Sequence, residues 1–398
     1  MKSTKLKILL LSVTGILLLY CSNSQQPQDE SNPSEKQISV KDSTAKDSIT
    51  AIDTITKTES EWDTIAPGDE AIRIIGRSST DEKNKVAIGW SGTSITVGFT
   101  GTELEAYLNV YNSLYDVFVD GEKEPSVVIN HVDAKYTKPH FTVIKDLKPG
   151  DHYVTLVRAA DYFSKDDYFL GFRIKGKANK NALPPRQKHK IQFIGNSITS
   201  GYAVFGEPPY KTFDASSEDY FYGFAGQTAL MLNAEAHCIS ECGHGLLRNG
   251  DLSTKDVLPI LYERTTQSDT SKWNHQEWIP DLIFINLGTN DYNKGAPDSV
   301  EFVDSTVSFV KRLRSYYPEA GIIIGSGPMI MNNLKLCRST LTDAVNKINS
   351  NGDKNVYRFI FKTFYDDDGN PVYAHPDKAK AFKDATALTT WIKETFGW

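Results

Sequence analysis

Four residues of this sequence have the types and the order that acyl transfer requires: Ser197, Gly243, Asn290 and His375. A serine hydroxyl can attack an acyl carbon once a histidine takes its proton. The oxyanion that then forms needs fixed donors, which a glycine N–H and an asparagine amide can supply. The set is therefore complete for the transfer of an acyl group.

Each of these residues also has an ordinary structural role. Ser197 is suited to cap a helix, and Gly243 to allow a turn. Asn290 can close a loop, and His375, which precedes a proline, can stand at the start of a helix. The four residues become a candidate site because each follows a predicted strand. The carboxyl ends of parallel strands gather along one edge of a sheet.

The second half of the chain predicts the elements that position this site. Strands are predicted from apolar runs at residues 191–194, 236–239, 281–287, 321–325 and 356–361. Helices are predicted at residues 219–232, 299–317, 335–350 and 376–396, with Pro376 at a first helical position. Strands that alternate with helices predict a mostly parallel sheet covered on both faces. We therefore expect an α/β/α domain over residues 191–398.

Residues 65–177 have a different pattern, with many short strand-like runs and no long helical period. The runs lie at residues 71–75, 85–90, 94–99, 103–110, 114–119, 126–130, 141–144, 152–158 and 168–174, with turn signals such as Gly101 between them. This pattern predicts a β-sandwich of the jelly-roll type. Such a domain could bind carbohydrate or act as a structural companion. Residues 178–190, with paired prolines and several basic residues, predict a linker.

The start of the chain predicts export. Residues 1–21 combine a lysine-rich start with an apolar stretch that ends at Cys21, which is typical of a secretory signal. Leu18-Leu19-Tyr20-Cys21 resembles a bacterial lipobox, with Tyr20 where a small residue is usual. We expect lipid at Cys21 to anchor the protein outside the cytoplasm on a bacterial membrane; without it the protein would be secreted or periplasmic. The polar residues 22–64 predict a disordered tether.

Composition excludes some classes of partner. The formal net charge is −6 and charged residues make up 24% of the chain, so nothing favours a nucleic-acid partner. The four cysteines predict no disulfide framework and lack zinc-finger spacing: Cys21, Cys238, Cys242 and Cys337. Because no His/Asp cluster has ligand spacing either, we expect no metal and no cofactor.

The motifs around the candidate residues resemble a known superfamily. G-N-S-I-T-S-G-Y, I-S-E-C-G-H-G-L-L-R-N, G-T-N-D and H-P-D are similar to the four blocks of the SGNH (GDSL-type) hydrolases. W-S-G-T-S-I-T-V-G-F-T-G-T-E-L and L-K-P-G-D-H-Y-V-T-L-V-R resemble the N-terminal jelly roll of carbohydrate esterase family 2. The resemblance covers residues 72–398. It implies an acetyl esterase that acts on plant polysaccharides such as xylan and glucomannan.

The resemblance also implies a role for each candidate residue. Ser197 would be the nucleophile and His375 the general base. The oxyanion hole would consist of the Ser197 N–H, the Gly243 N–H and the Asn290 amide, with Gly245 in place of Gly243 if the second block aligns two residues later. Asp291 would brace its loop.

Two residues depart from the superfamily pattern. Asn196 stands where an aspartate is usual, and Val372 stands where the acid of a catalytic triad is usual. A triad acid orients the histidine and stabilises its cation. Because members of this esterase family work with a Ser–His dyad, we expect a dyad whose histidine is oriented by a backbone carbonyl. Candidates for a displaced acid are Asp366, Asp367 and Asp368.

Two other functions remain open from the sequence. One is an SGNH lipase or thioesterase that prefers longer acyl chains. The other is a non-catalytic glycan-binding lipoprotein whose esterase site has decayed. Four aromatic residues could serve as sugar platforms, although core packing is the more common role: Tyr202, Tyr210, Trp273 and Trp278.

Overall fold

The computed structural model describes residues 61–110, 113–130, 140–160, 165–206, 215–329, 332–364, 371–372 and 374–398. Several predictions concern residues outside this part of the chain. These are the signal segment with Cys21, nearly all of the tether, Tyr210, and the three candidate acids at positions 366–368.

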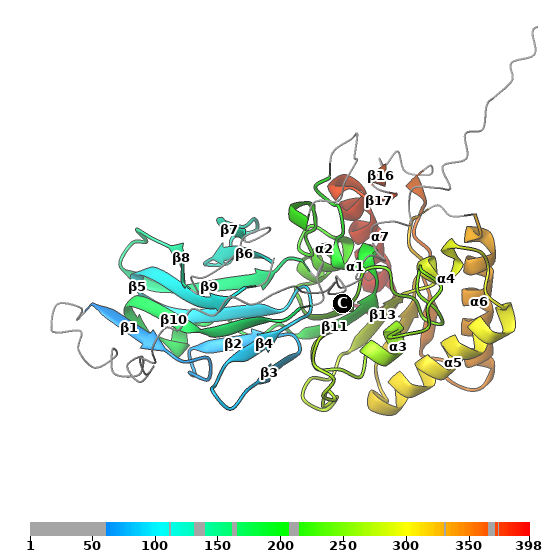
Figure 1. The fold of residues 1–398 in the computed structure, drawn as a ribbon, viewed down its shortest axis with the longest axis horizontal. Coiled ribbons are helices and arrows are strands. Elements are labelled where there is room, and N and C mark those ends of the chain that lie inside the picture. The colour runs from blue at the N-terminus through cyan, green and yellow to red at the C-terminus, as the bar shows by residue number, and fades with distance from the viewer. Residues whose placement is uncertain are drawn as a thin grey trace, which may run out of the picture.

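A strand-rich part and a part with helices lie side by side (Figure 1). The first part is one antiparallel sheet of ten strands, in the order β3-β4-β10-β5-β9-β6-β7, to which β1 adds at β10, and β2 and β8 at β5. The strands are β1 (Trp62–Ile65), β2 (Ile72–Ile75), β3 (Ser78–Thr80), β4 (Val86–Ile88), β5 (Ser94–Asn109), β6 (Leu114–Val119), β7 (Val127–Asn130), β8 (His140–Ile144), β9 (Gly150–Arg158) and β10 (Asp167–Ala178). The predicted strand-rich domain is confirmed, whereas its jelly-roll connectivity stays a prediction.

The longest strand, β5, replaces two strands that the sequence predicts. Gly101 reads as a turn signal, but the chain continues through it because its partner in β10 is also a glycine, Gly176. The register shifts between Lys175 and Gly176, and a Cβ on Gly101 would lie 2.3 Å from the Lys175 carbonyl oxygen. Glycine here therefore permits a bulge between paired strands.

Strand β1 begins three residues before the predicted start of the domain. Its residues read as part of the polar tether because its hydrophobic side chains are isolated in the sequence. They become a strand by pairing with β10, where the Arg173 guanidinium lies 4.5 Å from the centre of the Trp62 ring. This strand therefore depends on a contact between distant segments, which a local sequence pattern cannot show.

The second part is built on a parallel sheet of five strands in the order β12-β11-β13-β14-β15. The strands are β11 (His189–Gly195), β12 (Ala234–Ser240), β13 (Leu282–Asn286), β14 (Gly321–Ile324) and β15 (Val356–Arg358). Side chains alternate between its faces, so Ile194 and Ile285 join one hydrophobic core while Phe193 and Phe284 join the other. The predicted parallel sheet is confirmed.

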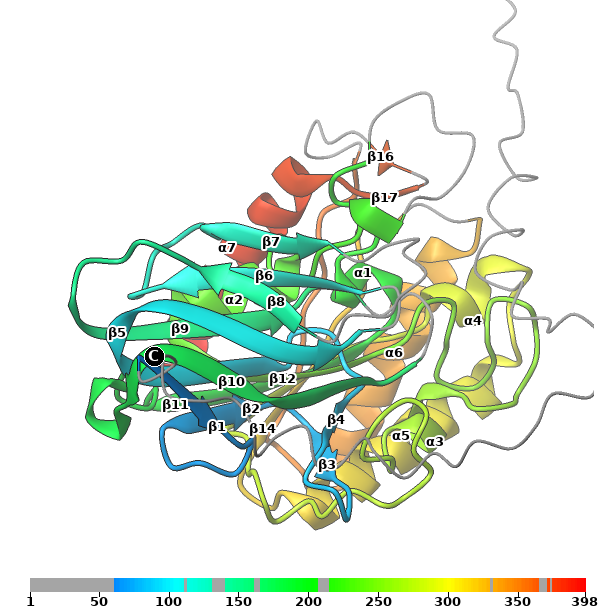
Figure 2. The same cartoon turned by 60° about the vertical axis from the view of Figure 1, so that its left-hand side comes forward.

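Helices cover both faces of this sheet (Figure 2). They are α1 (Ser197–Ser200), α2 (Phe224–Leu232), α3 (Leu258–Leu261), α4 (Thr289–Asn293), α5 (Ser299–Tyr316), α6 (Leu334–Ser350) and α7 (Lys378–Phe396), with single 3₁₀ turns at Lys180–Ala182 and Ala215–Ser217. Helices α2 and α7 pack together on one face, and α5 and α6 on the other. A two-residue hairpin, β16 (Pro371–Val372) with β17 (His375–Pro376), precedes α7. Among the described residues, no helix is both long and apolar enough to cross a membrane.

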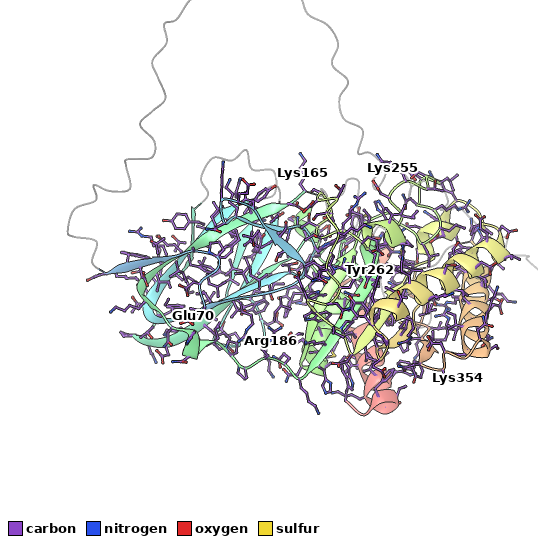
Figure 3. The ribbon with its side chains drawn as sticks, turned by 90° about the horizontal axis from the view of Figure 1, so that it is seen from below. Glu70, Lys165, Arg186, Lys255, Tyr262 and Lys354 are labelled. Atoms are coloured by element: carbon purple, nitrogen blue, oxygen red, sulfur yellow. The ribbon has the colours of Figure 1, made fainter. Side chains whose placement is uncertain are left out.

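The two parts share a buried interface. Trp90, which follows β4, is fully buried and donates its indole N–H to the Thr265 carbonyl at 2.9 Å. The buried guanidinium of Arg77 donates to the Tyr262 carbonyl and lies 4.6 Å from the centre of the Tyr262 ring. Figure 3 shows Tyr262 between the strand-rich part and α5. Burial of aromatic and charged groups from both parts argues for a fixed relative orientation.

Candidate active site

A tight turn at the carboxyl end of β11 presents Ser197. The strand ends at Gly195, where a Cβ would lie 2.0 Å from the Thr199 Oγ1 atom, so no larger residue fits. Asn196 caps α1, and its side-chain oxygen accepts a hydrogen bond from the Ile198 N–H at 3.3 Å. Ser197 is therefore the first residue of the helix and lies at the sheet edge.

Ser197 and His375 are in direct contact, although 178 positions separate them in the chain. The Ser197 Oγ atom lies 2.7 Å from the His375 Nε2 atom, and each residue is only 5% exposed. The Tyr202 ring packs against the imidazole, with 4.6 Å between ring centres. This is the geometry in which a histidine can take the proton of a serine hydroxyl.

The hairpin that carries His375 is held by its own strand pairing and by the helix that follows it. His375 pairs with Val372 across the hairpin, and Figure 2 shows β17 close to α1. After the hairpin, Asp377 caps α7 by accepting from the Lys380 N–H at 2.8 Å. The prediction of Pro376 at a first helical position is wrong for this reason: the cap at Asp377 starts the helix at Lys378, and Pro376 belongs to β17.

Backbone N–H groups and one side-chain amide lie on the loops next to this pair. Within the described part of the chain, neither the Ser197 N–H nor the Gly243 N–H has a hydrogen-bond partner. Gly243 follows β12 with a positive φ of 77°. The Gly245 N–H, by contrast, donates to the Asn249 Oδ1 atom at 3.2 Å. A donor that already has a partner is less suited to receive an oxyanion, so this contrast favours Gly243.

Asn290 and Asp291, of the G-T-N-D motif, contact the loop that contains Gly243. The Asn290 amide donates to the His244 carbonyl at 2.8 Å. An amide nitrogen has two hydrogens, so this bond fixes the orientation of the side chain and leaves one hydrogen for another acceptor. The contact also ties α4 to the loop that carries Gly243.

Asp291 is fully buried and accepts from three successive backbone N–H groups of that loop. Its carboxylate oxygens lie 3.0 Å from the Leu246 N atom, 2.7 Å from the Leu247 N atom and 3.0 Å from the Arg248 N atom. Burial raises the pKa of Asp291, and these hydrogen bonds oppose the rise because they stabilise the charged form. Asp291 thus holds the loop and does not reach toward the serine–histidine pair.

The acids at positions 366–368 lie outside the described residues. What faces the second nitrogen of His375 therefore stays a prediction.

The other side chains that the sequence singled out are buried. The aromatic candidates Tyr202, Trp273 and Trp278 are buried in the core and offer no free ring face. Cys238, Cys242 and Cys337 are buried free thiols. In the part of the chain that the structure describes, no cluster of His, Cys, Asp or Glu could hold a metal.

Sequence reasoning missed one exposed aromatic residue close to the site. Phe205 is 42% exposed, whereas Tyr202, three residues earlier, is 3% exposed. Nothing in the sequence separates Phe205 from the phenylalanines of the core, because its exposure depends on a turn whose partners come from distant segments.

Comparison with known proteins matches both parts of the chain to family models. Residues 74–185 match the model of the carbohydrate esterase 2 N-terminal domain, and residues 191–393 match that of GDSL-like lipases and acylhydrolases. A solved family two carbohydrate esterase from Clostridium thermocellum, in complex with cellohexaose, is similar with a TM-score of 0.77 and 30% identity. The match covers 82% of this chain and 99% of that one.

Two relatives known from their sequences are also similar. The cellulase/esterase CelE of Acetivibrio thermocellus is 31% identical over 328 residues, which is 81% of this chain but only 39% of that protein. An acetylxylan esterase / glucomannan deacetylase of Cellvibrio japonicus is 26% identical over 84% of this chain and 92% of its own length. This chain therefore corresponds to a minor portion of CelE and to nearly the whole of the second relative.

Proposed function

Because the chain belongs to carbohydrate esterase family 2, with a GDSL-type hydrolase domain, we propose that it removes acetyl groups from acetylated polysaccharides. The observation that carries the proposal is the buried contact of 2.7 Å between the Ser197 Oγ and His375 Nε2 atoms, beside two unpartnered N–H groups among the described residues. The relatives add the substrate class, since one of them is an acetylxylan esterase / glucomannan deacetylase.

In the first half of the reaction, Ser197 Oγ attacks the carbonyl carbon of the acetyl ester while His375 Nε2 takes the hydroxyl proton. Negative charge develops on the carbonyl oxygen. The N–H groups of Ser197 and Gly243 and the remaining amide hydrogen of Asn290 donate to it. The bond to the sugar oxygen then breaks, and His375 gives its proton to that oxygen. The deacetylated sugar leaves, and Ser197 carries the acetyl group.

The second half repeats these steps with water. His375 takes a proton from a water molecule, whose oxygen attacks the acetyl carbon of the acyl-enzyme. The same three donors stabilise the oxyanion. When the bond to Ser197 Oγ breaks, His375 returns the proton to the serine and acetate is released. The other proton of the water leaves with the product, which ionises to acetate in solution. His375 carries every remaining proton, and no cofactor is needed.

We assign the catalytic pair as a dyad. Val372 occupies the position of the usual acid and lies across the β16–β17 hairpin from His375. Two features support a fixed imidazole without that acid: the Tyr202 ring against one side, and the capped start of α7 directly after the hairpin that carries the histidine. A backbone carbonyl would then hold the second ring nitrogen in the tautomer that leaves Nε2 free to accept a proton.

Acetate release across a substrate panel tests the function. Acetylated xylan, acetylated glucomannan and butyrylated xylan are incubated with the wild type and with Ser197→Ala. We expect release of acetate from at least one acetylated polysaccharide by the wild type only. Faster release of butyrate would favour a lipase or thioesterase, and binding of polysaccharide without any release would favour a glycan-binding protein.

We propose in addition that the chain is exported and anchored by lipid at Cys21, and that its N-terminal domain is a jelly roll. The lysine-rich apolar start and the Leu-Leu-Tyr-Cys sequence support the anchor. An anchor followed by a polar tether would let the enzyme reach insoluble polymer outside the cell. Labelling of cells with a fatty-acid probe should mark the wild type and leave Cys21→Ser unmarked. Equal labelling of both proteins would contradict the anchor.

A further inference from the structure

An exposed phenylalanine lies beside the catalytic pair, and other aromatic side chains pack against it and hold it in place. Phe205 is 42% exposed, and its backbone N–H donates to the Ser217 carbonyl at 3.0 Å. Its ring lies T-shaped to the Tyr222 ring, with 4.8 Å between the centres. Tyr222 in turn packs on Phe221, and Phe221 on Phe118 of the N-terminal sheet. The exposed ring is thus supported from both parts of the molecule.

A lysine completes this surface. The Lys378 ammonium lies 3.7 Å from the centre of the Tyr222 ring and 5.5 Å from the centre of the Phe205 ring. Lys378 is exposed and forms no ion pair with any of the described residues. A cation over aromatic faces is held in place by the attraction of the ring electrons, so Lys378 is positioned without being neutralised.

The surface lies next to the reacting atoms. The backbone N–H of Lys378 donates to the Val204 carbonyl at 2.9 Å, which fixes the start of α7 to the residue before Phe205. His375 precedes Lys378 by three residues, so their Cα atoms are at most about 11 Å apart. Phe205 is similarly close to His375. It follows Tyr202 by three residues, and the Tyr202 ring packs on the His375 ring.

We propose that Phe205 and Lys378 form a subsite for a pyranose ring of the polysaccharide, next to the ring whose acetyl ester is hydrolysed. The proposal rests on the proposed esterase function and specifies how the enzyme distinguishes a polymer from a small acetate. The Phe205 ring stacks on the C–H face of the sugar, and Lys378 donates hydrogen bonds to oxygens at its rim.

The chemistry of the two residues matches that of a sugar ring. A pyranose has an apolar face of C–H groups and a rim of hydroxyls. Binding it requires a flat apolar surface with a few placed polar groups. Phe205 supplies the flat surface and Lys378 the donors. The nearby Glu124 carboxylate accepts from the Tyr222 hydroxyl at 2.5 Å, and among the described residues no ion pair joins it to Lys378. The supporting contacts hold the ring before substrate arrives, which lowers the entropy lost on binding.

A selectivity measurement tests the subsite. The kcat/KM for an acetylated xylo- or manno-oligosaccharide is divided by the kcat/KM for trifluoroethyl acetate, which has no ring to stack. We expect Phe205→Ala to lower this ratio about tenfold, which corresponds to about 1.4 kcal/mol. Lys378→Met, which keeps the length of the side chain and removes its charge, should lower the ratio about fivefold. Both changes should act on KM for the oligosaccharide.

Two matched variants serve as controls. Phe382→Ala removes another exposed phenylalanine, which lies on α7 one turn after Lys378. Lys393→Met removes an exposed lysine of the same helix about 22 Å from Lys378, at 1.5 Å per residue. Both should change the ratio less than twofold. A ratio that is unchanged in Phe205→Ala, or that falls equally in the controls, overturns the subsite. If the wild type hydrolyses trifluoroethyl acetate but no oligosaccharide, the proposed function fails instead.

Discussion

Two carboxyl groups buried between the parts of the molecule make its stability depend on pH. Asp116 on β6 is fully buried, and Asp219, in the segment before α2, is 6% exposed. Burial raises the pKa of Asp116 to about 7, the charge of Glu124 adds to the rise, and contact with the Asp219 side chain opposes it. Burial and the charge of Asp116 also raise the pKa of Asp219 well above its ordinary value.

The sign of the effect follows from proton binding. A carboxyl group whose pKa is higher in the folded protein than in the unfolded chain binds more protons when folded. The free energy of unfolding therefore falls as the pH rises through that window, here from 3.8 to about 7. When the pH rises from 5 to 8, the raised pKa of Asp116 lowers the free energy of unfolding by about 3 kcal/mol. The loss is about 1.36 kcal/mol for each pH unit between pH 5 and the pKa of about 7.

The substitution Asp116→Asn removes this cost. An amide has the shape of the protonated acid and never ionises, so it also removes charge repulsion from Asp219. We expect the variant to gain about 3 kcal/mol in the free energy of unfolding, relative to the wild type, between pH 5 and pH 8. Urea titrations followed by tryptophan fluorescence at the two pH values measure the difference. Asp343→Asn, on the exposed face of α6, is the control and should show no such change.

The result that refutes this reasoning is a stability difference between variant and wild type that is the same at pH 5 and at pH 8. The carboxyl pair would then titrate alike in the folded and unfolded protein. The pair also touches the site indirectly, because the Asp219 N–H donates to the Gly201 carbonyl at the end of α1. Loss of activity at alkaline pH should therefore be smaller in Asp116→Asn.

Three further predictions concern the proposed active site and the residues around it. Asn290→Ala removes an oxyanion donor and should lower kcat by about 10²- to 10³-fold with little change in KM, measured on an aryl acetate; a change confined to KM would contradict this role. Asp291→Ala leaves three buried N–H groups without their acceptor and should lower the free energy of unfolding by about 3 kcal/mol or more, with a loss of kcat; unchanged stability in urea titrations would contradict the brace. Single Asn substitutions of Asp366, Asp367 and Asp368 should each lower kcat less than about tenfold, and a loss near 10⁴-fold at one of them would identify a triad acid.

Much of the second domain could be predicted from local sequence. Its strands are short apolar runs that alternate with long amphipathic helices, so periodicity marks them without knowledge of contacts. Because parallel strands bring their carboxyl ends together, topology places Ser197 at the edge of the sheet. It does not place His375, which lies in the antiparallel β16–β17 hairpin beyond the end of β15; only the resemblance of the motifs indicated that it would meet Ser197. The family matches confirm the resemblance that the motifs indicated.

Long-range contacts account for what the sequence did not reveal. Strand β1 exists because β10 lies beside it, and Gly101 continues a strand because Gly176 stands opposite. The exposure of Phe205 depends on a turn held by Ser217 and Lys378, and the burial of Asp116 depends on how the two parts pack together. No local pattern reports such contacts, because each joins segments that are far apart in the chain.

The central claim is that Ser197 forms an acetyl-enzyme with His375 as its base. Mass spectrometry of the protein, quenched during turnover of an aryl acetate, tests it most directly. The account predicts one added acetyl group on the peptide that contains Ser197 in the wild type, and little or no adduct in a His375→Ala protein over the same time, since the attack by Ser197 then lacks its base. An acetyl group on any other residue, or full turnover by Ser197→Ala, would contradict it.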